Sequence, residues 1–217
     1  MKLHYAGKYD LNPASLPSGP HRPGAVPFRE AQDSGELSRL CTRLSLLLLL
    51  ALGGLLVLRC GAGAVLRGAL WGFLLSLLFL FPHELLHALC FRQDVYLYTN
   101  LQQGMLFVVG PEEMSRGRFV FMSLLPNLLF GFFPFLFAMA APAHTVLGVL
   151  GASCISMGVG DYYNVYHALT QMPKGARTYM HGFNSFWYLP PGDGAGPGAV
   201  GPAGCKKTGL SSTALSL

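Results

Sequence analysis

The sequence has few charged residues. Asp, Glu, Lys and Arg make up only 12% of its 217 residues, whereas 52% are hydrophobic. Soluble domains carry roughly 25% charged residues. The mean hydropathy is +0.42. A soluble domain of this length would therefore lack a charged surface, and the composition predicts an integral membrane protein.

The sequence also lacks paired cysteines and basic clusters of the kind that bind nucleic acid. Its net charge is +5, but the basic residues lie between apolar runs, so we interpret them as topology signals and expect no nucleic-acid partner. The five cysteines show no CxxC spacing, and we expect free or buried thiols rather than a disulfide framework. They are Cys41, Cys60, Cys90, Cys154 and Cys205.

No apolar run opens the chain. Residues 1–43 are polar and rich in Pro and Gly, and the first apolar run starts near Leu44, so we expect a retained internal anchor rather than a signal peptide. Residues 1–36 are expected to be mostly irregular, and the Gly/Pro/Ala-rich stretch from Pro190 to be disordered. The predicted organisation is a cytoplasmic N-terminal tail (1–40), a membrane domain (41–190) and a disordered C-terminal tail (191–217).

Four apolar segments predict four transmembrane helices, because a span needs roughly 20 apolar residues. No internal repeat relates them. The predicted fold is therefore an all-α membrane protein. The segments cover about residues 44–58, 68–91, 119–141 and 143–169.

The loop between the second and third segments contains two short β-prone runs. Residues 95–99 and 105–109 are rich in Val, Tyr, Leu and Phe, and a Gln-Gln-Gly stretch separates them. This pattern predicts a hairpin at the membrane surface.

The distribution of Lys and Arg predicts the orientation. With both ends inside, thirteen basic residues face the cytoplasm, namely six in the N-tail, three in the second loop and four in the C-tail, and two lie outside. Cytoplasmic loops carry the excess of basic residues. We therefore expect a multi-pass protein of the cell membrane with its N- and C-termini in the cytoplasm.

The second apolar segment contains the motif His83-Glu84-Leu85-Leu86-His87. Residues four apart on a helix project from one face, so both imidazoles can bind one tetrahedral zinc ion. Glu84 lies beside the open metal position, where it can take a proton from bound water and deliver it to a leaving amine. Ionisable groups inside a span are functional candidates. The alternative is a polar helix end whose side chains are simply solvated.

A third ligand is expected from another span at the same depth. Asp161 is the acidic residue within the fourth segment. Helix rise puts His83 about 22 Å and His87 about 28 Å from the outer end, and Asp161 about 25 Å. Gly158 and Gly160 leave room for close helix approach. The alternative for Asp161 is a helix N-cap after a break at these glycines.

Other polar residues near the motif are candidates for supporting roles. Asn164 is three residues after Asp161 and is predicted as its partner, or else as an interfacial side chain. Asn127 follows Pro126, which should open the third helix, and its amide would either bind substrate backbone or satisfy the broken helix. His167 is expected at the surface. Pro82 should kink the second helix just before the motif.

Four features of this sequence carry a resemblance to known proteins. They are Gly7-Lys8-Tyr9 with Leu16-Pro17, the HELLH motif, Leu125-Pro126, and Gly160-Asp161. Over roughly residues 1–190 the sequence resembles a family of small bacterial membrane proteins described as zincin peptidases, similar in layout to site-2 zinc metalloproteases. The resemblance implies that His83, His87 and Asp161 bind Zn²⁺ and that Glu84 is the catalytic base.

These observations predict an intramembrane zinc metalloprotease that hydrolyses peptide bonds of membrane-embedded or juxtamembrane substrates. Its partners would be the lipid bilayer and a membrane-protein or peptide substrate, which the β-prone loop could hold as an added strand. A non-catalytic metal-binding membrane scaffold is the alternative. A small proton-coupled transporter that uses Glu84 and Asp161 is a third hypothesis, which the HExxH spacing and the missing repeat argue against.

Overall fold

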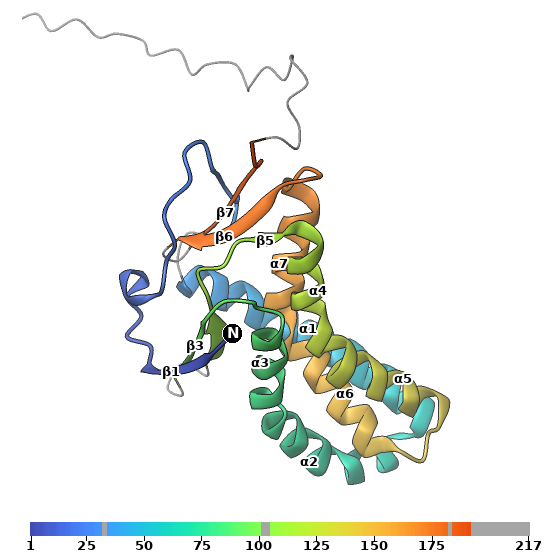
Figure 1. The fold of residues 1–217 in the computed structure, drawn as a ribbon. Coiled ribbons are helices and arrows are strands. Elements are labelled where there is room, and N and C mark those ends of the chain that lie inside the picture. Colours follow the sequence, from blue (N-terminus) through green and yellow to red (C-terminus); the bar gives the residue numbers. More distant parts are fainter. Residues whose placement is uncertain (32–33, 101–104, 182–183, 192–217) are drawn as a thin grey trace, which may run out of the picture.

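The computed structural model describes residues 1–31, 34–100, 105–181 and 184–191. A body of apolar helices carries two small sheets at one end, and the connections after α1 and after α5 lie at the other (Figure 1). The expectation of an all-α fold is wrong, because strands from both ends of the chain accompany the helices. The predicted C-terminal tail lies almost wholly outside the described residues.

The first three helices form two long apolar stretches, of which α1 is the first and α2 with α3 the second. Helix α1 (Ser34–Cys60) turns at Gly61, whose φ of 83° suits a residue without Cβ, into α2 (Ala62–Leu78). Helix α3 (Leu80–Leu89) follows after Phe79 and runs in a different direction (Figure 1). Pro82 lacks the amide that would bond the carbonyl of Leu78, so the helix is interrupted just there. The kink predicted before the motif is confirmed.

The regular hydrogen bonding of the next helix is also interrupted at a proline. Helix α4 (Arg116–Pro126) continues as a π-helix, η3 (Asn127–Phe132), and then as α5 (Phe133–Ala140). Pro126 has no N–H to donate, and the wider π-turn begins at the next residue. The sequence prediction that Pro126 opens this helix is therefore confirmed.

The last two helices form a bent pair. Helix α6 (Thr145–Met157) and helix α7 (Val159–Gln171) meet at Gly158 with a bend of 50°. Helix α6 packs against α1, α2 and α5. Close approach depends on small residues, since a Cβ on Gly151 would lie 2.5 Å from the backbone nitrogen of Phe135.

Within the described residues, three helical stretches are long and apolar enough to cross a membrane, and the bent pair α6–α7 would make a fourth. Each of the four predicted apolar segments overlaps one of the three stretches or the bent pair. The stretches cover Gly35–Cys60, Ala62–Leu89 and Arg116–Ala140.

The first sheet, called sheet A, joins the start of the chain to the loop after α3. Strand β3 (Val95–Asn100) pairs antiparallel with β4 (Met105–Val109) and parallel with β1 (Leu3–Lys8), which gives the order β1-β3-β4. The predicted hairpin at residues 95–109 is confirmed. Most of residues 1–31 lie outside regular elements, as expected, but β1 is an ordered strand, and Tyr9 and Leu16 belong to a buried apolar cluster beside it.

The second sheet, called sheet B, also uses chain segments that are distant in sequence. Strand β2 (Val26–Pro27) pairs with β7 (Asn184–Tyr188), β7 with β6 (Arg177–His181), and β6 with β5 (Met114–Ser115), all antiparallel. Two of these strands have only two residues, which is too short for a periodic sequence pattern. Sheet B was not predicted for that reason.

A buried carboxylate fixes the connection between α3 and α4. Glu112 accepts hydrogen bonds from the backbone amides of Arg92 and Gln93, at 2.6 and 3.0 Å, and pairs with Arg118. The Arg118 Nε donates to the carbonyl of Cys90 at 2.9 Å. Burial raises the pKa of Glu112, but the guanidinium and the two amides outweigh it, so the pKa is lowered.

Replacement of this carboxylate should destabilise the fold in a pH-dependent way. We expect Glu112→Gln to lower the free energy of unfolding by about 2 kcal/mol at pH 7, because hydrogen bonds to a charged group are weakened. The folded pKa of Glu112 is below its ordinary value of 4.5. Its contribution is therefore present above that value and is lost as the pH falls through the folded pKa.

The measurement is thermal unfolding of the purified wild type and variant from pH 7 down to pH 3. The stability difference should shrink as the medium is acidified. A difference that stays constant over this range would show that the charge of Glu112 makes no contribution.

Candidate metal centre

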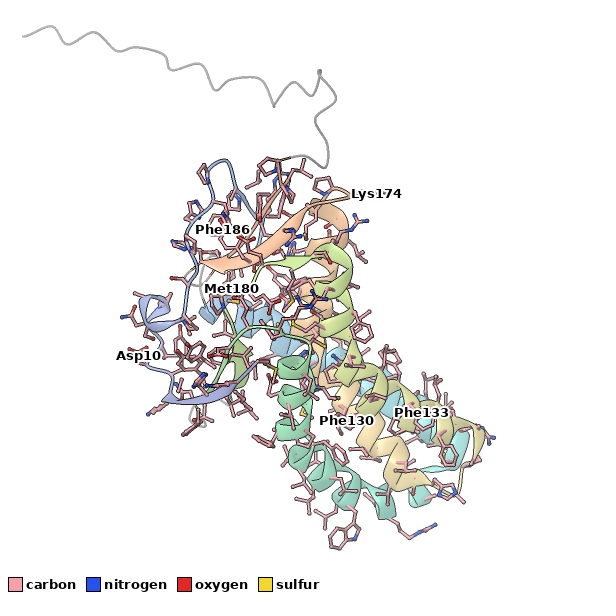
Figure 2. The ribbon with its side chains drawn as sticks, viewed as in Figure 1. Asp10, Phe130, Phe133, Lys174, Met180 and Phe186 are labelled. Carbon is pink, nitrogen blue, oxygen red and sulfur yellow. The ribbon has the colours of Figure 1, made fainter. Side chains whose placement is uncertain are left out.

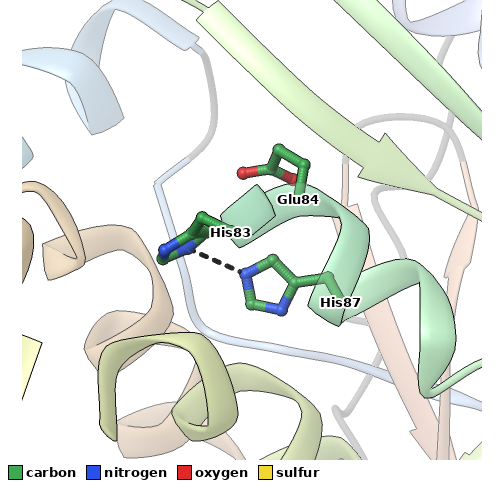
Figure 3. Close-up of side chains that lie close together, drawn as sticks. All are labelled: His83, Glu84 and His87. Carbon is green, nitrogen blue, oxygen red and sulfur yellow. Dashed lines mark hydrogen bonds between the residues drawn. The ribbon is translucent and has the colours of Figure 1, made fainter. Parts of the chain in front are cut away.

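Helix α3 presents the two motif histidines on one face. The Nε2 atoms of His83 and His87 lie 3.1 Å apart, and the ring centroids lie 4.8 Å apart (Figure 3). This follows from the helical repeat, which puts residues four apart one turn above each other. Both side chains are largely buried.

Helix α7 contributes the carboxylate that completes the group. Asp161 Oδ2 lies 3.2 Å from His83 Nε2, and Oδ1 lies 3.3 Å from His87 Nε2. Asp161 is in the first turn of α7, immediately after the bend at Gly158. The three side chains that the sequence predicts as metal ligands therefore lie together, although Asp161 follows His87 by 74 positions in the sequence.

The spacing of the donor atoms fits a tetrahedral zinc ion. Bonds of 2.0–2.1 Å to four ligands separate neighbouring donors by roughly 3.3 Å. The two Nε2 atoms lie 3.1 Å apart, and each lies 3.2 to 3.3 Å from a carboxylate oxygen of Asp161, Oδ2 for His83 and Oδ1 for His87. Two imidazoles and one carboxylate also form the donor set of many catalytic zinc sites. Three ligands would leave the fourth position open.

A backbone carbonyl orients one of these rings. His87 Nδ1 lies 3.0 Å from the carbonyl oxygen of Met122 on α4 and donates its proton there. That bond leaves the lone pair of Nε2 directed toward His83 and Asp161. Metal-binding histidines commonly have their second nitrogen held in this way.

Glu84 lies beside the two histidines, on a different side of helix α3 (Figure 3). A carboxylate oxygen of Glu84 and the ring nitrogens of His83 and His87 all lie within 4.8 Å of one another. The backbone N–H of Val108 on strand β4 donates to Glu84 Oε2 at 3.1 Å. Sheet A thus holds the carboxylate that the sequence predicts as the base.

Asn127 contacts the predicted ligand Asp161 directly. It is fully buried, and its Nδ2 donates to Asp161 Oδ2 at 2.7 Å and to the carbonyl of Ser123 at 3.1 Å. The sequence left open whether this amide binds substrate or satisfies the opened helix. In the structure it does the second and also binds Asp161.

Two other sequence predictions for α7 have a different outcome. Asn164 lines the cavity beside the site, but no hydrogen bond joins its side chain to Asp161 in the described part of the chain. His167 is 7% exposed, so the prediction of a surface histidine is wrong. The N-terminal segment covers it, with Phe28 packed against its ring.

A cavity of about 320 Å³ opens beside Glu84, His87 and Asp161. Its walls come from helices α1, α3, α4 and α7, from both sheets and from the N-terminal segment. Most of the lining is apolar, which would favour binding of apolar side chains. Large apolar residues of the lining include Phe91, Phe107, Phe119, Met114 and Met122.

Three of these contacts could not be found from the sequence. The carbonyl of Met122 and the amide of Val108 are backbone groups, which any residue type supplies. The hydroxyl of Tyr162 donates to Asn127 Oδ1 at 3.2 Å, but its position next to Asp161 predicts a different helix face.

One comparison with known proteins gives a match, to a peptidase family. Residues 76–177, a little under half of the chain, match the family model described as "Putative zincin peptidase". The matched region contains the HELLH motif and Asp161. The predicted resemblance to zincin peptidases is thereby confirmed for this region. Neither the curated proteins nor the solved structures gave a match.

The donor geometry predicts zinc binding that depends on each ligand. The purified protein should contain about one zinc ion per chain. His83→Ala and His87→Ala should reduce zinc to background, because two remaining ligands do not close the site. Elemental analysis after removal of loosely bound metal makes the measurement.

His4→Ala is the matched control, because His4 lies on the surface of sheet A, where it pairs with Asp94. It should retain the zinc content of the wild type. Equal zinc content in all three variants would contradict the assignment of the ligands.

Proposed function

We propose that this protein is an intramembrane zinc metalloprotease that hydrolyses peptide bonds of membrane-embedded or juxtamembrane segments. The observation that carries the proposal is the convergence of His83, His87 and Asp161 with Glu84 beside them. The family match supports zincin-type peptidase chemistry. The apolar helices that hold the ligands support the location in a membrane.

The exposed surface of the helices supports burial in lipid. Leu50 on α1 is 73% exposed, Leu66 on α2 77%, and Phe133 on α5 71%. Phe133 lies on the outside of the helical body (Figure 2). In α1 only 6% of the most apolar window is buried inside the chain. Water contact with so much apolar side-chain surface would be costly, and a bilayer removes that cost.

The arrangement of the two ends fits the predicted orientation. Both sheets, the start of the chain and the strands after α7 lie at one end of the helices (Figure 1). The excess of Lys and Arg lies in the same segments. The positive-inside rule then puts the sheets and the metal centre toward the cytoplasm, with both termini on that side.

The side chains divide the chemistry of hydrolysis between them. His83, His87 and Asp161 would hold zinc, which supplies a polarised water and an electrophile for the peptide carbonyl when bound. Glu84 is placed to accept a proton and to pass it to the leaving amine. The amide of Val108 keeps this carboxylate in position.

The edge of strand β4 offers a place for an extended substrate. The Val108 N–H points to Glu84 and therefore away from β3. Residues alternate along an antiparallel pair, so the backbone of Leu106 also faces outward on this edge. A substrate strand that pairs with this edge would lie alongside Glu84.

Loss of the Glu84 carboxylate should abolish cleavage without loss of metal. We expect Glu84→Gln to reduce cleavage by about 10²- to 10⁴-fold, the usual contribution of a general base. Zinc content should stay at the wild-type level. The measurement is cleavage of single-span membrane substrates in proteoliposomes, followed by mass spectrometry of the products.

Asp94→Asn serves as the control, since this carboxylate lies on the surface of sheet A and pairs with His4. It should cleave like the wild type. Equal cleavage by Glu84→Gln and wild type would remove the mechanism. One zinc ion per chain with no cleavage of any substrate would assign the site to a metal-binding scaffold instead.

A further inference from the structure

Both N–H donors of the Asn127 amide are used inside the protein, and the side chain is fully buried. Its two N–H donors point to Ser123 and Asp161, and its oxygen accepts the hydroxyl of Tyr162 at 3.2 Å. An Asn side chain has two N–H donors and one carbonyl oxygen. The three partners also determine which end of the amide faces Asp161. The side-chain amide of Asn127 is therefore held in one orientation, through both its nitrogen and its oxygen.

A glycine on the opposite side makes room for this amide. A Cβ on Gly158 would lie 1.8 Å from Asn127 Oδ1 and 2.6 Å from its Cγ. No side chain fits at such distances without displacement of Asn127. A Cβ on Gly160 would meet nothing within 4 Å. Of the two glycines before Asp161, only Gly158 is required by its surroundings.

Two irregular points of the helices meet at this contact. Asn127 is the first residue of the π-helix η3, and Gly158 is the break between α6 and α7. A π-turn costs hydrogen-bond geometry and occurs often at functional sites. In this protein the widened turn and the break lie against each other, with the amide of Asn127 between Gly158 and Asp161.

We propose that Gly158, Asn127 and Tyr162 form a clamp that orients the Asp161 carboxylate toward the metal position. The three are positioning residues, because they act through Asp161. Tyr162 donates a hydrogen bond to the amide oxygen of Asn127, and Gly158 leaves the space that this oxygen occupies. The Asn127 Nδ2 donates to Asp161 Oδ2. The inference rests on the proposed metal centre, but it does not depend on peptide cleavage.

The test compares zinc affinity between matched variants of the full-length protein. Loss of groups that orient a metal ligand typically weakens metal binding by 10- to 100-fold. We expect Gly158→Ala to weaken zinc binding by that factor and Gly160→Ala to bind like the wild type. Tyr162→Phe should fall at the lower end, about tenfold. Tyr166→Phe, one turn further on α7 and exposed, should show no change.

Two readouts report the site itself. Zinc affinity is measured by competition with a chelator of known affinity, and the visible absorption of the Co²⁺-substituted protein reports the ligand geometry. Gly158→Ala and Tyr162→Phe should both alter the Co²⁺ spectrum. Gly160→Ala and Tyr166→Phe should reproduce the wild-type spectrum.

Further variants separate the clamp from general stability. A Cβ on Gly68 of α2 would lie 2.7 Å from Thr145 Oγ1 at the start of α6, at the opposite end of that helix from Gly158, so Gly68→Ala should lower the melting temperature and leave zinc affinity of the folded protein unchanged. The double variant Asn127→Ala/Gly158→Ala removes the clash. It should melt like Asn127→Ala alone and still bind zinc weakly.

Zinc affinity and a Co²⁺ spectrum in Gly158→Ala equal to those of Gly160→Ala would overturn the clamp alone. The same holds if Tyr162→Phe changes only the melting temperature. A wild-type protein that binds no zinc would overturn the proposed function, and the clamp with it.

Discussion

The contact between the Asp161 carboxylate and the imidazoles of His83 and His87 is the interaction around which the structure is arranged. A carboxylate inside an apolar helical body is costly unless it is paired and hydrogen-bonded. Helix α3 supplies the two rings, α4 and η3 supply the carbonyl of Met122 and the amide of Asn127, and α7 supplies Asp161. These three chain segments must therefore all be in place before the Asp161 carboxylate has its hydrogen-bond partners.

Helices and sheets have separate tasks in this arrangement. The helices set the positions of the three donor atoms, whereas the sheets shape the space beside them. Strand β4 holds Glu84, and Tyr9, Leu16 and the segment at Glu30 form part of the cavity wall. Residues far from the motif in sequence therefore determine what can reach the motif.

The sequence predicted what depends on local pattern and chemistry. The spacing of His83 and His87 and the opening at Pro126 follow from the helical repeat and from proline geometry, and helix rise brought Asp161 to the right level. It could not predict β1 or sheet B, whose partners lie far along the chain. His167 was misjudged because the covering N-terminal segment decides which face of α7 is buried.

The pairing of β1 with β3 sets an order of assembly during synthesis. The two strands start 92 residues apart, at Leu3 and Val95, and their pairing is parallel. At 5–20 residues per second, the first strand waits about 5 to 20 seconds for its partner to be made. Sheet B needs β6 and β7, which follow α7. The walls of the cavity beside Glu84, His87 and Asp161 are therefore complete only when nearly the whole described chain has been synthesised.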